Sequence, residues 1–255
     1  MEPEKVLQEI SSQVAGCKSC QLNLSRKKAV PGEGPAGAEI MLIGEGPGFY
    51  ENEQGRPFVG AAGKFLDELL EKAGVSRKEV FITNVVKCRP PGNRDPQPEE
   101  LSACGAYLDR QIDAISPLII VTLGRYSMSK FLPNVRISEV HGKPAWVRGR
   151  LIIPMFHPAA ALHQPSLKTS VERDFARLPE WIVQARQNGQ NSASHAVAEP
   201  SAGAYGTGAD PEKAPLEKVW QASLLLPDAE PEEEPPAAEE PENIKKDTPT
   251  QLSLF

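Results

Sequence analysis

Four short runs dominated by apolar residues divide the first two-thirds of the chain. They cover residues 38–43, 80–87, 118–123 and 151–156. Runs of this kind indicate strands that are buried on both faces, as in a parallel sheet covered by helices. The pattern therefore predicts an α/β protein, a three-layer α/β/α sandwich with a four-stranded, mostly parallel central sheet. Residues 133–150 carry no clear pattern, although Trp146 and Val147 suit a short edge strand.

Around these runs, apolar residues recur at the three- and four-residue spacing of amphipathic helices. Proline suits a first helical position, so Pro98 begins one of them. From Asn188 onward the periodicity stops and Pro, Ala, Glu and Ser dominate, a composition that buries too little apolar surface to fold alone. Helices are predicted at residues 3–15, 61–73, 98–116, 124–131 and 166–187.

Charge divides the 255 residues unevenly. Residues 188–255 hold 13 acidic and 4 basic residues, a net charge of −9, whereas residues 1–187 hold 21 acidic and 24 basic residues, a net charge of +3. A mildly basic folded part is compatible with binding to nucleic acid. No apolar run is long enough for a membrane span, and the charged N-terminus lacks the layout of a signal peptide. We therefore expect a cytoplasmic protein with a folded domain at 1–187, a disordered acidic linker at 188–250 and a separate peptide at 251–255.

The stretch GEGPGFYENEQGRPFVGAAG, residues 44–63, lies between the first predicted strand and the following helix. A strand, a glycine-rich turn and a helix in this order place backbone N–H groups around a ligand. Pro47 interrupts the glycine order of dinucleotide-binding folds, and no Gly-Lys-Ser/Thr follows, which argues against a phosphate loop. Functional groups of a parallel sheet gather at the carboxyl ends of its strands, where Glu45, Asn84 and His157 fall.

Four cysteines form a close pair, Cys17 and Cys20, and a spread pair, Cys88 and Cys104. Disulfides are rare in cytoplasmic proteins. Zinc sites usually show a second close pair, whereas a loop cysteine and a helix cysteine can converge on a larger cluster. The spacing favours a [4Fe–4S] cluster and leaves zinc, or unrelated buried cysteines, as alternatives.

Taken together, these motifs resemble the family 4 uracil-DNA glycosylases, the iron–sulfur class of that superfamily. The resemblance covers residues 17 to about 168 and implies a [4Fe–4S] cluster held by the four cysteines. It also implies a DNA-repair enzyme that hydrolyses the N-glycosidic bond of uracil in DNA, leaving an abasic site for base-excision repair. The matching segments are CKSC, GEGPGFYENEQGRPFVGAAG, FITNVVKCRPPGNRDP, Cys104, VTLG and FHPAAAL.

The resemblance further implies a pocket for a uracil that has been flipped out of the duplex. Phe58 is expected to stack on the base. Asn84 is expected to accept a hydrogen bond from uracil N3–H and donate one to O4, which refuses cytosine because its donor and acceptor are exchanged. His157 is expected to donate to O2, where negative charge develops as the bond breaks.

The backbone of Gly44, Glu45 and Gly46 is expected to line the same pocket. Glu51 is a second catalytic candidate, which either positions the attacking water, or walls off the 5-methyl group of thymine, or does both. The role of the Glu45 side chain stays equally open. A glycosidase-type pair of catalytic carboxylates is therefore not inferred.

DNA is expected to contact the loop at residues 157–163, with Leu162 as a wedge into the vacated stack. His163 stands where many similar proteins have arginine, which weakens the expected phosphate contact. Asn93, in the loop after the second predicted strand, is a further expected DNA contact. A relative that traps uracil-DNA covalently has a reactive histidine in this region, whereas residues 85–103 contain no histidine, so a turnover enzyme is expected.

The last five residues, QLSLF, resemble the peptide with which bacterial proteins bind the replicative sliding clamp. Apolar anchors would enter a cleft on the clamp, while the glutamine makes polar contacts. We expect a nucleoid-associated monomer that binds DNA and the clamp. Two alternatives stay open, a non-catalytic iron–sulfur DNA-binding accessory protein of the clamp and a glycosylase with a wider range of deaminated bases. The clamp-binding residues are Gln251, Leu252, Leu254 and Phe255.

Overall fold

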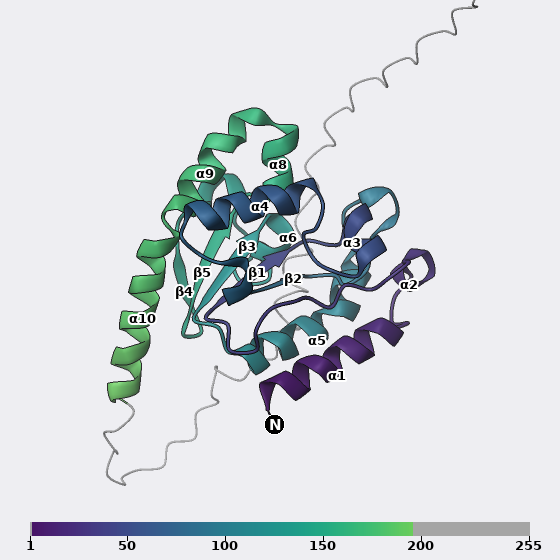
Figure 1. Cartoon of the computed structure of the whole chain (residues 1–255), viewed down its shortest axis with the longest axis horizontal. Coiled ribbons are helices and arrows are strands. Elements are labelled where there is room, and N and C mark those ends of the chain that lie inside the picture. Colours follow the sequence, from purple (N-terminus) through teal and green to yellow (C-terminus); the bar gives the residue numbers. More distant parts are fainter. Residues whose placement is uncertain (1, 196–255) are drawn as a thin grey trace, which may run out of the picture. The chain divides into compact units, whose positions relative to one another are not determined.

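The computed structural model describes residues 2–195, so the predicted peptide at 251–255 and the linker from residue 196 lie outside the described part. Its centre is a five-stranded sheet with strands in the order β2-β1-β3-β5-β4 (Figure 1). The four strands β2, β1, β3 and β5 run parallel, which confirms a mostly parallel sheet. The strands are β1 (Ile40–Gly44), β2 (Val80–Asn84), β3 (Ile119–Leu123), β4 (Ala145–Val147) and β5 (Arg150–Met155).

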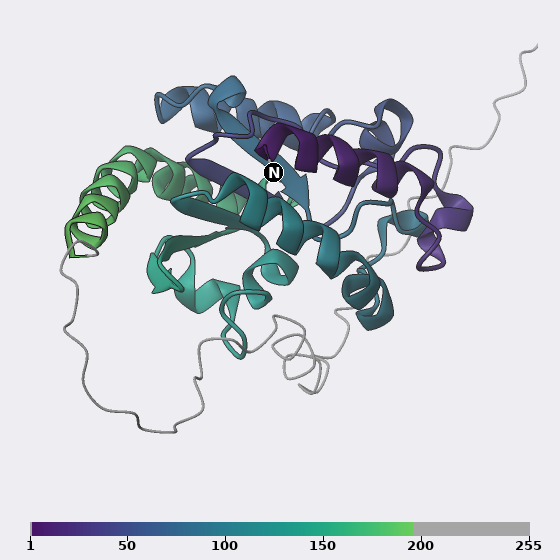
Figure 2. The ribbon, with the colours of Figure 1, turned by 90° about the horizontal axis from the view of Figure 1, so that it is seen from below.

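Helices cover both faces of this sheet, which confirms the three-layer arrangement. The helices α4, α9 and α10 pack on one face, and α5 packs on the other, with α1 beside it (Figures 1 and 2). Within residues 2–195, no helix is both long and apolar enough to cross a membrane. The helices are α1 (Pro3–Gly16), α2 (Leu22–Ser25), α3 (Phe49–Gln54), α4 (Ala61–Lys72), α5 (Pro98–Ile115), α6 (Arg125–Ser129), α7 (Ile137–Val140), α8 (Pro158–His163), α9 (Lys168–Ala176) and α10 (Leu178–His195), with 3₁₀ turns η1 (Arg77–Glu79), η2 (Pro91–Asn93) and η3 (Pro165–Leu167).

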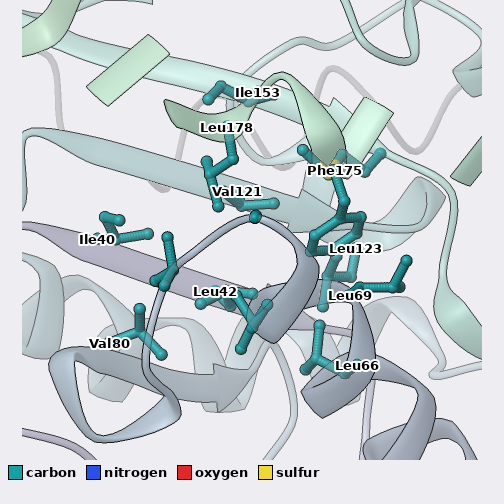
Figure 3. Packing of buried hydrophobic residues seen from close by; sticks show 14 of the residues in the cluster. Ile40, Leu42, Leu66, Leu69, Val80, Val121, Leu123, Ile153, Phe175 and Leu178 are labelled. Atoms are coloured by element: carbon teal, nitrogen blue, oxygen red, sulfur yellow. The ribbon is translucent and has the colours of Figure 1, made fainter. Parts of the chain in front are cut away.

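Two apolar cores lie on opposite faces of the sheet because successive strand residues point to opposite sides. Ile40 and Leu42 of β1 belong to the core under α4, α9 and α10, whereas Met41 and Ile43 belong to the core under α5. Every residue of β1, β2 and β3 is buried, as the continuous apolar runs predicted. Figure 3 shows the first core, where side chains of α4, α9 and α10 meet those of the strands; its labelled residues are Ile40, Leu42, Leu66, Leu69, Val80, Val121, Leu123, Ile153, Phe175 and Leu178.

The sheet has five strands rather than the predicted four. β4 pairs antiparallel with β5 at the sheet edge, with Trp146 opposite Leu151. The two strands are joined by Arg148 and Gly149, both at positive φ (49° and 76°), as two-residue hairpin turns require. No apolar run marks β4 because an edge strand is covered on fewer sides, and its side chains are only partly buried or exposed.

The predicted helix at residues 166–187 is divided into η3, α9 and α10. Pro179 explains the break before α10, because its ring would clash with the carbonyl group of Phe175 in a continuous helix. α10 then continues to His195, beyond the end at Gln187 that the periodicity indicated.

The glycine-rich stretch contains the short helix α3, which the sequence analysis did not predict. Gly48 precedes α3, and Gly55 ends it in the left-handed conformation with a φ of 77°. The parallel register places Gly44 beside Asn84, and Leu123 beside Met155. The carboxyl ends of the four parallel strands therefore meet at one edge, next to α3.

Candidate functional site

A cavity of about 410 Å³ lies at the carboxyl edge of the sheet. Segments that are far apart in the sequence form it: the loop after β1, the start of α3, the end of β2, the loop around η2, and α8. Most of the predicted site residues line this single cavity. They are Glu45, Gly46, Glu51, Phe58, Asn84, Asn93, His157 and His163, joined by Pro47, Gly48, Ala62, Pro90, Arg94, Pro96 and Ala159.

Asn84 is the last residue of β2 and reaches the cavity from the end of the strand. Asn84 is only 1% exposed, and its Oδ1 atom has no hydrogen-bond partner among the described residues. A buried amide oxygen without a partner is costly, which is why such atoms are rare in folded proteins. An unsatisfied acceptor in a cavity wall is the feature expected of a group that a ligand completes.

The aromatic ring of Phe58 is held beside Asn84 by two close approaches to glycine. A Cβ atom on Gly44 would lie 2.4 Å from Asn84 Oδ1 and 2.8 Å from the Phe58 ring. A Cβ atom on Gly63 would lie 2.0 Å from the Phe58 carbonyl oxygen. Phe58 itself has a φ of 51°, an unfavourable conformation for a bulky residue, and Arg77 Nη1 donates to its carbonyl at 3.1 Å. Gly44 therefore supports the cavity from behind and is not among the residues that line it.

His157 follows β5 and caps the N-terminus of α8. Its Nδ1 accepts a hydrogen bond from the backbone N–H of Ala159 at 3.1 Å, so the ring proton is assigned to Nε2. Burial lowers the pKa of His157 to about 4, although the nearby Glu51 acts in the opposite direction. The ring is stacked against that of Phe58, with centroids 5.4 Å apart and an interplanar angle of 25°. His157 is thus a neutral donor at physiological pH.

Glu51 of α3 connects two parts of the cavity wall. Its Oε1 accepts hydrogen bonds from the backbone N–H groups of Val59 at 2.8 Å and Gly60 at 3.0 Å. These donors lie directly between Phe58 and α4. Because charge-assisted bonds to backbone N–H groups are strong, Glu51 fixes the Phe58 loop against α3.

Glu45 is the carboxyl group in the cavity whose pKa is markedly shifted. Burial, together with the smaller effect of the nearby Asp95, raises the pKa of Glu45 to about 7, although Arg125 acts in the opposite direction. Asp95 and Arg125 form an ion pair at the outer side of the site. Glu45 therefore exchanges its proton near neutral pH, as a general base must.

The three predicted DNA contacts differ in position. Asn93 lines the cavity from η2 at a φ of 57°, and its Oδ1 accepts from Arg89 Nε at 2.7 Å. His163 lines the cavity from the end of α8. Leu162, its neighbour, is 47% exposed and lies outside the cavity lining.

Lys87 is a buried residue beneath the cavity that the sequence analysis missed. Its Nζ donates to Thr83 Oγ1 at 2.6 Å, to the Asn84 carbonyl oxygen at 2.9 Å and to Gln111 Oε1 at 2.7 Å. Burial lowers the pKa of Lys87 to about 7. In the sequence, Lys87 stands at the end of an apolar run. A buried lysine at that position has the same sequence pattern as an exposed lysine at the end of a strand.

The four cysteines line one small cavity between α1, α5 and the loop after β2. Among residues 2–195, no three His, Cys, Asp or Glu side chains are arranged to bind a single metal ion. A zinc ion requires its ligands to converge on one point. In a four-iron cluster each thiolate binds a different iron, so the ligands surround a larger body. The four cysteines come from three separate segments and can supply the four thiolates that a [4Fe–4S] cluster requires.

Donors around the cysteines strengthen that fit. Arg26 Nη1 donates to Cys88 Sγ at 3.1 Å, and the backbone N–H of Lys87 donates to Cys104 Sγ at 3.2 Å. Hydrogen bonds to sulfur and nearby positive charge stabilise anionic clusters. Burial raises the pKa of Cys104 to about 12, whereas the charge and the backbone N–H of Lys87 act in the opposite direction.

Comparisons with known proteins show the family of this chain. The family model described as "Uracil DNA glycosylase superfamily" matches residues 31–178. A type-4 uracil-DNA glycosylase of Sulfurisphaera tokodaii is 50% identical over 187 residues, which cover 69% of this chain and 85% of the relative. One of Thermotoga maritima is 44% identical over 184 residues, covering 70% and 96%. A type-5 uracil-DNA glycosylase of Pyrobaculum aerophilum is 30% identical over 150 residues, covering 52% and 66%. On this similarity, the chain belongs to the type-4 class of the uracil-DNA glycosylase superfamily.

Proposed function

We propose that this chain removes uracil from DNA by hydrolysing its N-glycosidic bond and leaves an abasic site for base-excision repair. One observation carries the proposal: Asn84, whose amide oxygen has no hydrogen-bond partner among the described residues, lines the same cavity as Phe58 and the neutral His157 donor. These three groups supply base selection, base stacking and stabilisation of the leaving group. The cavity of about 410 Å³ has ample room for one pyrimidine.

Asn84 selects uracil through its amide. Its unsatisfied Oδ1 accepts from uracil N3–H, and its Nδ2 donates to O4. Cytosine has an unprotonated N3 and an amino group at position 4, so it would meet acceptor with acceptor and donor with donor. A buried mismatch of this kind costs several kcal/mol, which is enough to reject the normal base.

His157 stabilises the negative charge that develops on uracil as the bond breaks. Its Nε2–H donates to O2 of the leaving group, while Nδ1 stays bound to the backbone of α8. The uracil imide delocalises its charge, so a hydrogen-bond donor suffices and no proton transfer is needed. A neutral donor in a buried site acts as an oxyanion hole does.

The two carboxyl groups are assigned different tasks. Glu45, with its pKa near 7, positions and deprotonates the water that attacks the sugar. Glu51, whose Oε1 is bound to the Phe58 loop, orders the cavity wall and restricts the space beside the base. The backbone of Gly46 completes the wall next to Glu45.

DNA is held at the rim of this cavity. His163 and Asn93 line the rim from opposite segments and suit contacts to the sugar-phosphate backbone. Leu162, exposed at the end of α8, suits insertion into the space that the flipped nucleotide leaves.

The decisive experiment measures alkali-sensitive cleavage of a labelled oligonucleotide that contains one uracil. Wild type is compared with H157A and N84A opposite guanine, opposite adenine and on a single strand. We expect cleavage by wild type and losses of about 100-fold or more in both variants, because H157A removes the donor to O2 and N84A removes the amide that holds the base. DNA binding without excision by wild type would instead support a non-catalytic accessory protein.

We also propose that Cys17, Cys20, Cys88 and Cys104 hold a [4Fe–4S] cluster. When bound, the cluster supplies a rigid link between α1, the loop after β2 and α5, all of which contribute to its cavity. Excision is assigned to the residues of the 410 Å³ cavity and not to the cluster.

We propose, finally, that residues 251–255 bind the replicative sliding clamp and that the preceding acidic segment is the linker that gives them reach. Composition and the QLSLF motif support this proposal. The protein would then act as a monomer in the cytoplasm at the nucleoid. A peptide ending in QLSLF should bind purified clamp, and the same peptide without Leu254 and Phe255 should not; equal binding by both would contradict the proposal.

A further inference from the structure

Two aromatic side chains stand exposed at the start of α3. Phe49 is 52% exposed and Tyr50 is 58% exposed. Their rings pack edge to face, with centroids 5.4 Å apart and an interplanar angle of 87°. Adjacent large aromatic residues on a surface indicate a binding site more often than scattered single ones do.

This aromatic pair lies at the rim of the uracil cavity. The residues on either side of it, Gly48 and Glu51, both line the cavity. A Cβ atom on Gly60, whose N–H binds Glu51, would lie 3.3 Å from Tyr50 Cδ2. Tyr50 therefore stands directly beside the carboxylate that orders the cavity wall.

Arg89 connects the aromatic pair Phe49 and Tyr50 to Asn93, which lies on another segment of the cavity wall. Its guanidinium carbon lies 5.4 Å from the centroid of the Phe49 ring, a cation–π distance. Its Nε donates to Oδ1 of Asn93, which lines the cavity. Phe49, Tyr50 and Arg89 thus form one surface, which we call the aromatic rim.

The aromatic rim is held in place before any ligand binds. Glu51 ties α3 to the backbone of Val59 and Gly60. Asn52, the buried residue of α3, accepts a hydrogen bond from the backbone N–H of Lys27 at 2.8 Å. A preformed surface loses little conformational entropy on binding.

We propose that the aromatic rim is a stacking site for the nucleobase next to the flipped uracil on the same strand. This inference rests on the proposed function. Flipping removes a stacking partner from each neighbouring base, and an exposed ring at the rim replaces it. Aromatic stacking is tolerant of base identity, and the arginine adds positive charge for the adjacent phosphate.

Excision kinetics on two matched single-stranded substrates test the inference. In one, normal bases flank the uracil; in the other, both flanking nucleotides are tetrahydrofuran abasic analogues. The variant F49A/Y50A is compared with wild type and with W146A, which removes an exposed aromatic residue of edge strand β4. We expect F49A/Y50A to lower kcat/KM about 10-fold on the first substrate and to leave the second nearly unchanged. W146A should match wild type on both.

A fluorescent base reports the stacking directly. 2-Aminopurine is placed 5′ or 3′ of 2′-fluoro-deoxyuridine, which resists excision, and its quenching on binding is measured. Wild type and W146A should quench one of the two positions, and F49A/Y50A should not. Inhibition by free uracil should be equal in all three proteins, which shows that the cavity is intact.

Provided that wild type excises uracil, two outcomes would contradict the proposed stacking site. One is unchanged kinetics in F49A/Y50A, and the other is an equal loss on both substrates, which would place the aromatic pair in the architecture of the cavity. A wild-type protein that does not excise uracil would overturn the proposed function itself.

Discussion

At the scale of single residues, the cavity depends on the absence of side-chain atoms as much as on polar groups. Gly44 leaves room for Asn84 Oδ1 and the Phe58 ring, which approach where its Cβ would stand. Phe58 accepts an unfavourable φ of 51° because the contacts around it hold the ring in the wall. Strain of this kind is typical of sites in which geometry matters more than stability.

Gly44→Ala should therefore impair excision severely. The added Cβ would meet Asn84 Oδ1 at 2.4 Å and must displace the amide or the Phe58 ring. Displacements of about 1 Å at a reacting site cost on the order of 100-fold in rate. The matched control is Gly37→Ala, because a Cβ there meets nothing within 4 Å. Steady-state excision by both variants checks this, and an active Gly44→Ala enzyme would contradict the packing argument.

The acidity of Glu45 predicts a pH dependence of activity. If Glu45 acts ionised with a pKa of about 7, kcat/KM should fall about 10-fold per pH unit below 7. His157, whose pKa is about 4, stays neutral over that range and adds no second change. Glu45→Gln should be slow at all pH values and lack the transition near 7. Excision rates between pH 5 and 9 measure both profiles.

The same shift predicts a pH dependence of stability. Because the folded pKa of Glu45 lies above the ordinary value of 4.5, the native state retains a proton that the unfolded state has lost. Its contribution to stability is fully present below pH 4.5 and is lost as the pH rises through 7. Glu45→Gln should therefore raise the melting temperature relative to wild type at pH 8 and change it little at pH 4.5. If the two proteins instead differed in melting temperature by the same amount at every pH, the protonation of Glu45 would not be the cause of the difference.

At the scale of elements, a buried polar network joins β2 to α5. Lys87 binds Thr83 and the Asn84 carbonyl group at the end of β2, and Gln111 of α5. Gln111 Nε2 in turn donates to the Pro31 carbonyl oxygen at 2.7 Å. The network fixes the end of β2, from which Asn84 enters the cavity.

Lys87→Met should destabilise the protein markedly. It would remove the lysine donor from Thr83 Oγ1, the Asn84 carbonyl oxygen and Gln111 Oε1, of which Gln111 Oε1 keeps only the longer bond from Thr83 Oγ1. The cost is about 1–3 kcal/mol for each buried group left unsatisfied. Lys78→Met, at an exposed position in η1, is the control. Melting temperatures measured by circular dichroism compare the two, and similar small shifts would show that water replaces the lost donor.

At the scale of the whole molecule, distant parts of the chain meet at the cysteines. Cys17 and Cys20 follow α1, Cys88 follows β2, and Cys104 lies within α5. α1 packs through one apolar stripe, with Ile10 and Val14 buried, and Arg110 of α5 donates to the side chains of Glu9 and Gln13. A bound cluster would anchor this peripheral helix to the sheet.

If the four cysteines hold the proposed cluster, its removal should loosen the N-terminal region first. Cys104→Ser is expected to lose iron, sulfide and visible absorbance, to lower the melting temperature and to speed tryptic cleavage between residues 17 and 30. Ser102→Ala, at an exposed position in the same helix, is the control. Metal analysis provides an independent check, since zinc in place of iron and sulfide would refute the [4Fe–4S] assignment.

Much of the architecture follows from local patterns. Continuous apolar runs predicted the four parallel strands because a strand buried on both faces has few positions that face solvent. The runs also placed Glu45, Asn84 and His157 at the ends of strands, and parallel pairing brings such ends to one edge. β4 was only weakly indicated, since an edge strand has a partly polar pattern. α3 was missed because a helix of six residues between glycines is too short to show a repeating apolar pattern.

By itself, the sequence determined the fold class, the order of the strands along the chain, the motifs of the family and several of the residues that line the cavity, among them Phe58, Asn84 and His157. Only the tertiary structure decided their chemical state. The unsatisfied Asn84 oxygen, the pKa of Glu45, the burial of Lys87 and the aromatic rim of α3 all arise where segments distant in sequence pack together. Burial and hydrogen bonding depend on every neighbour in space, and local sequence patterns record only neighbours along the chain.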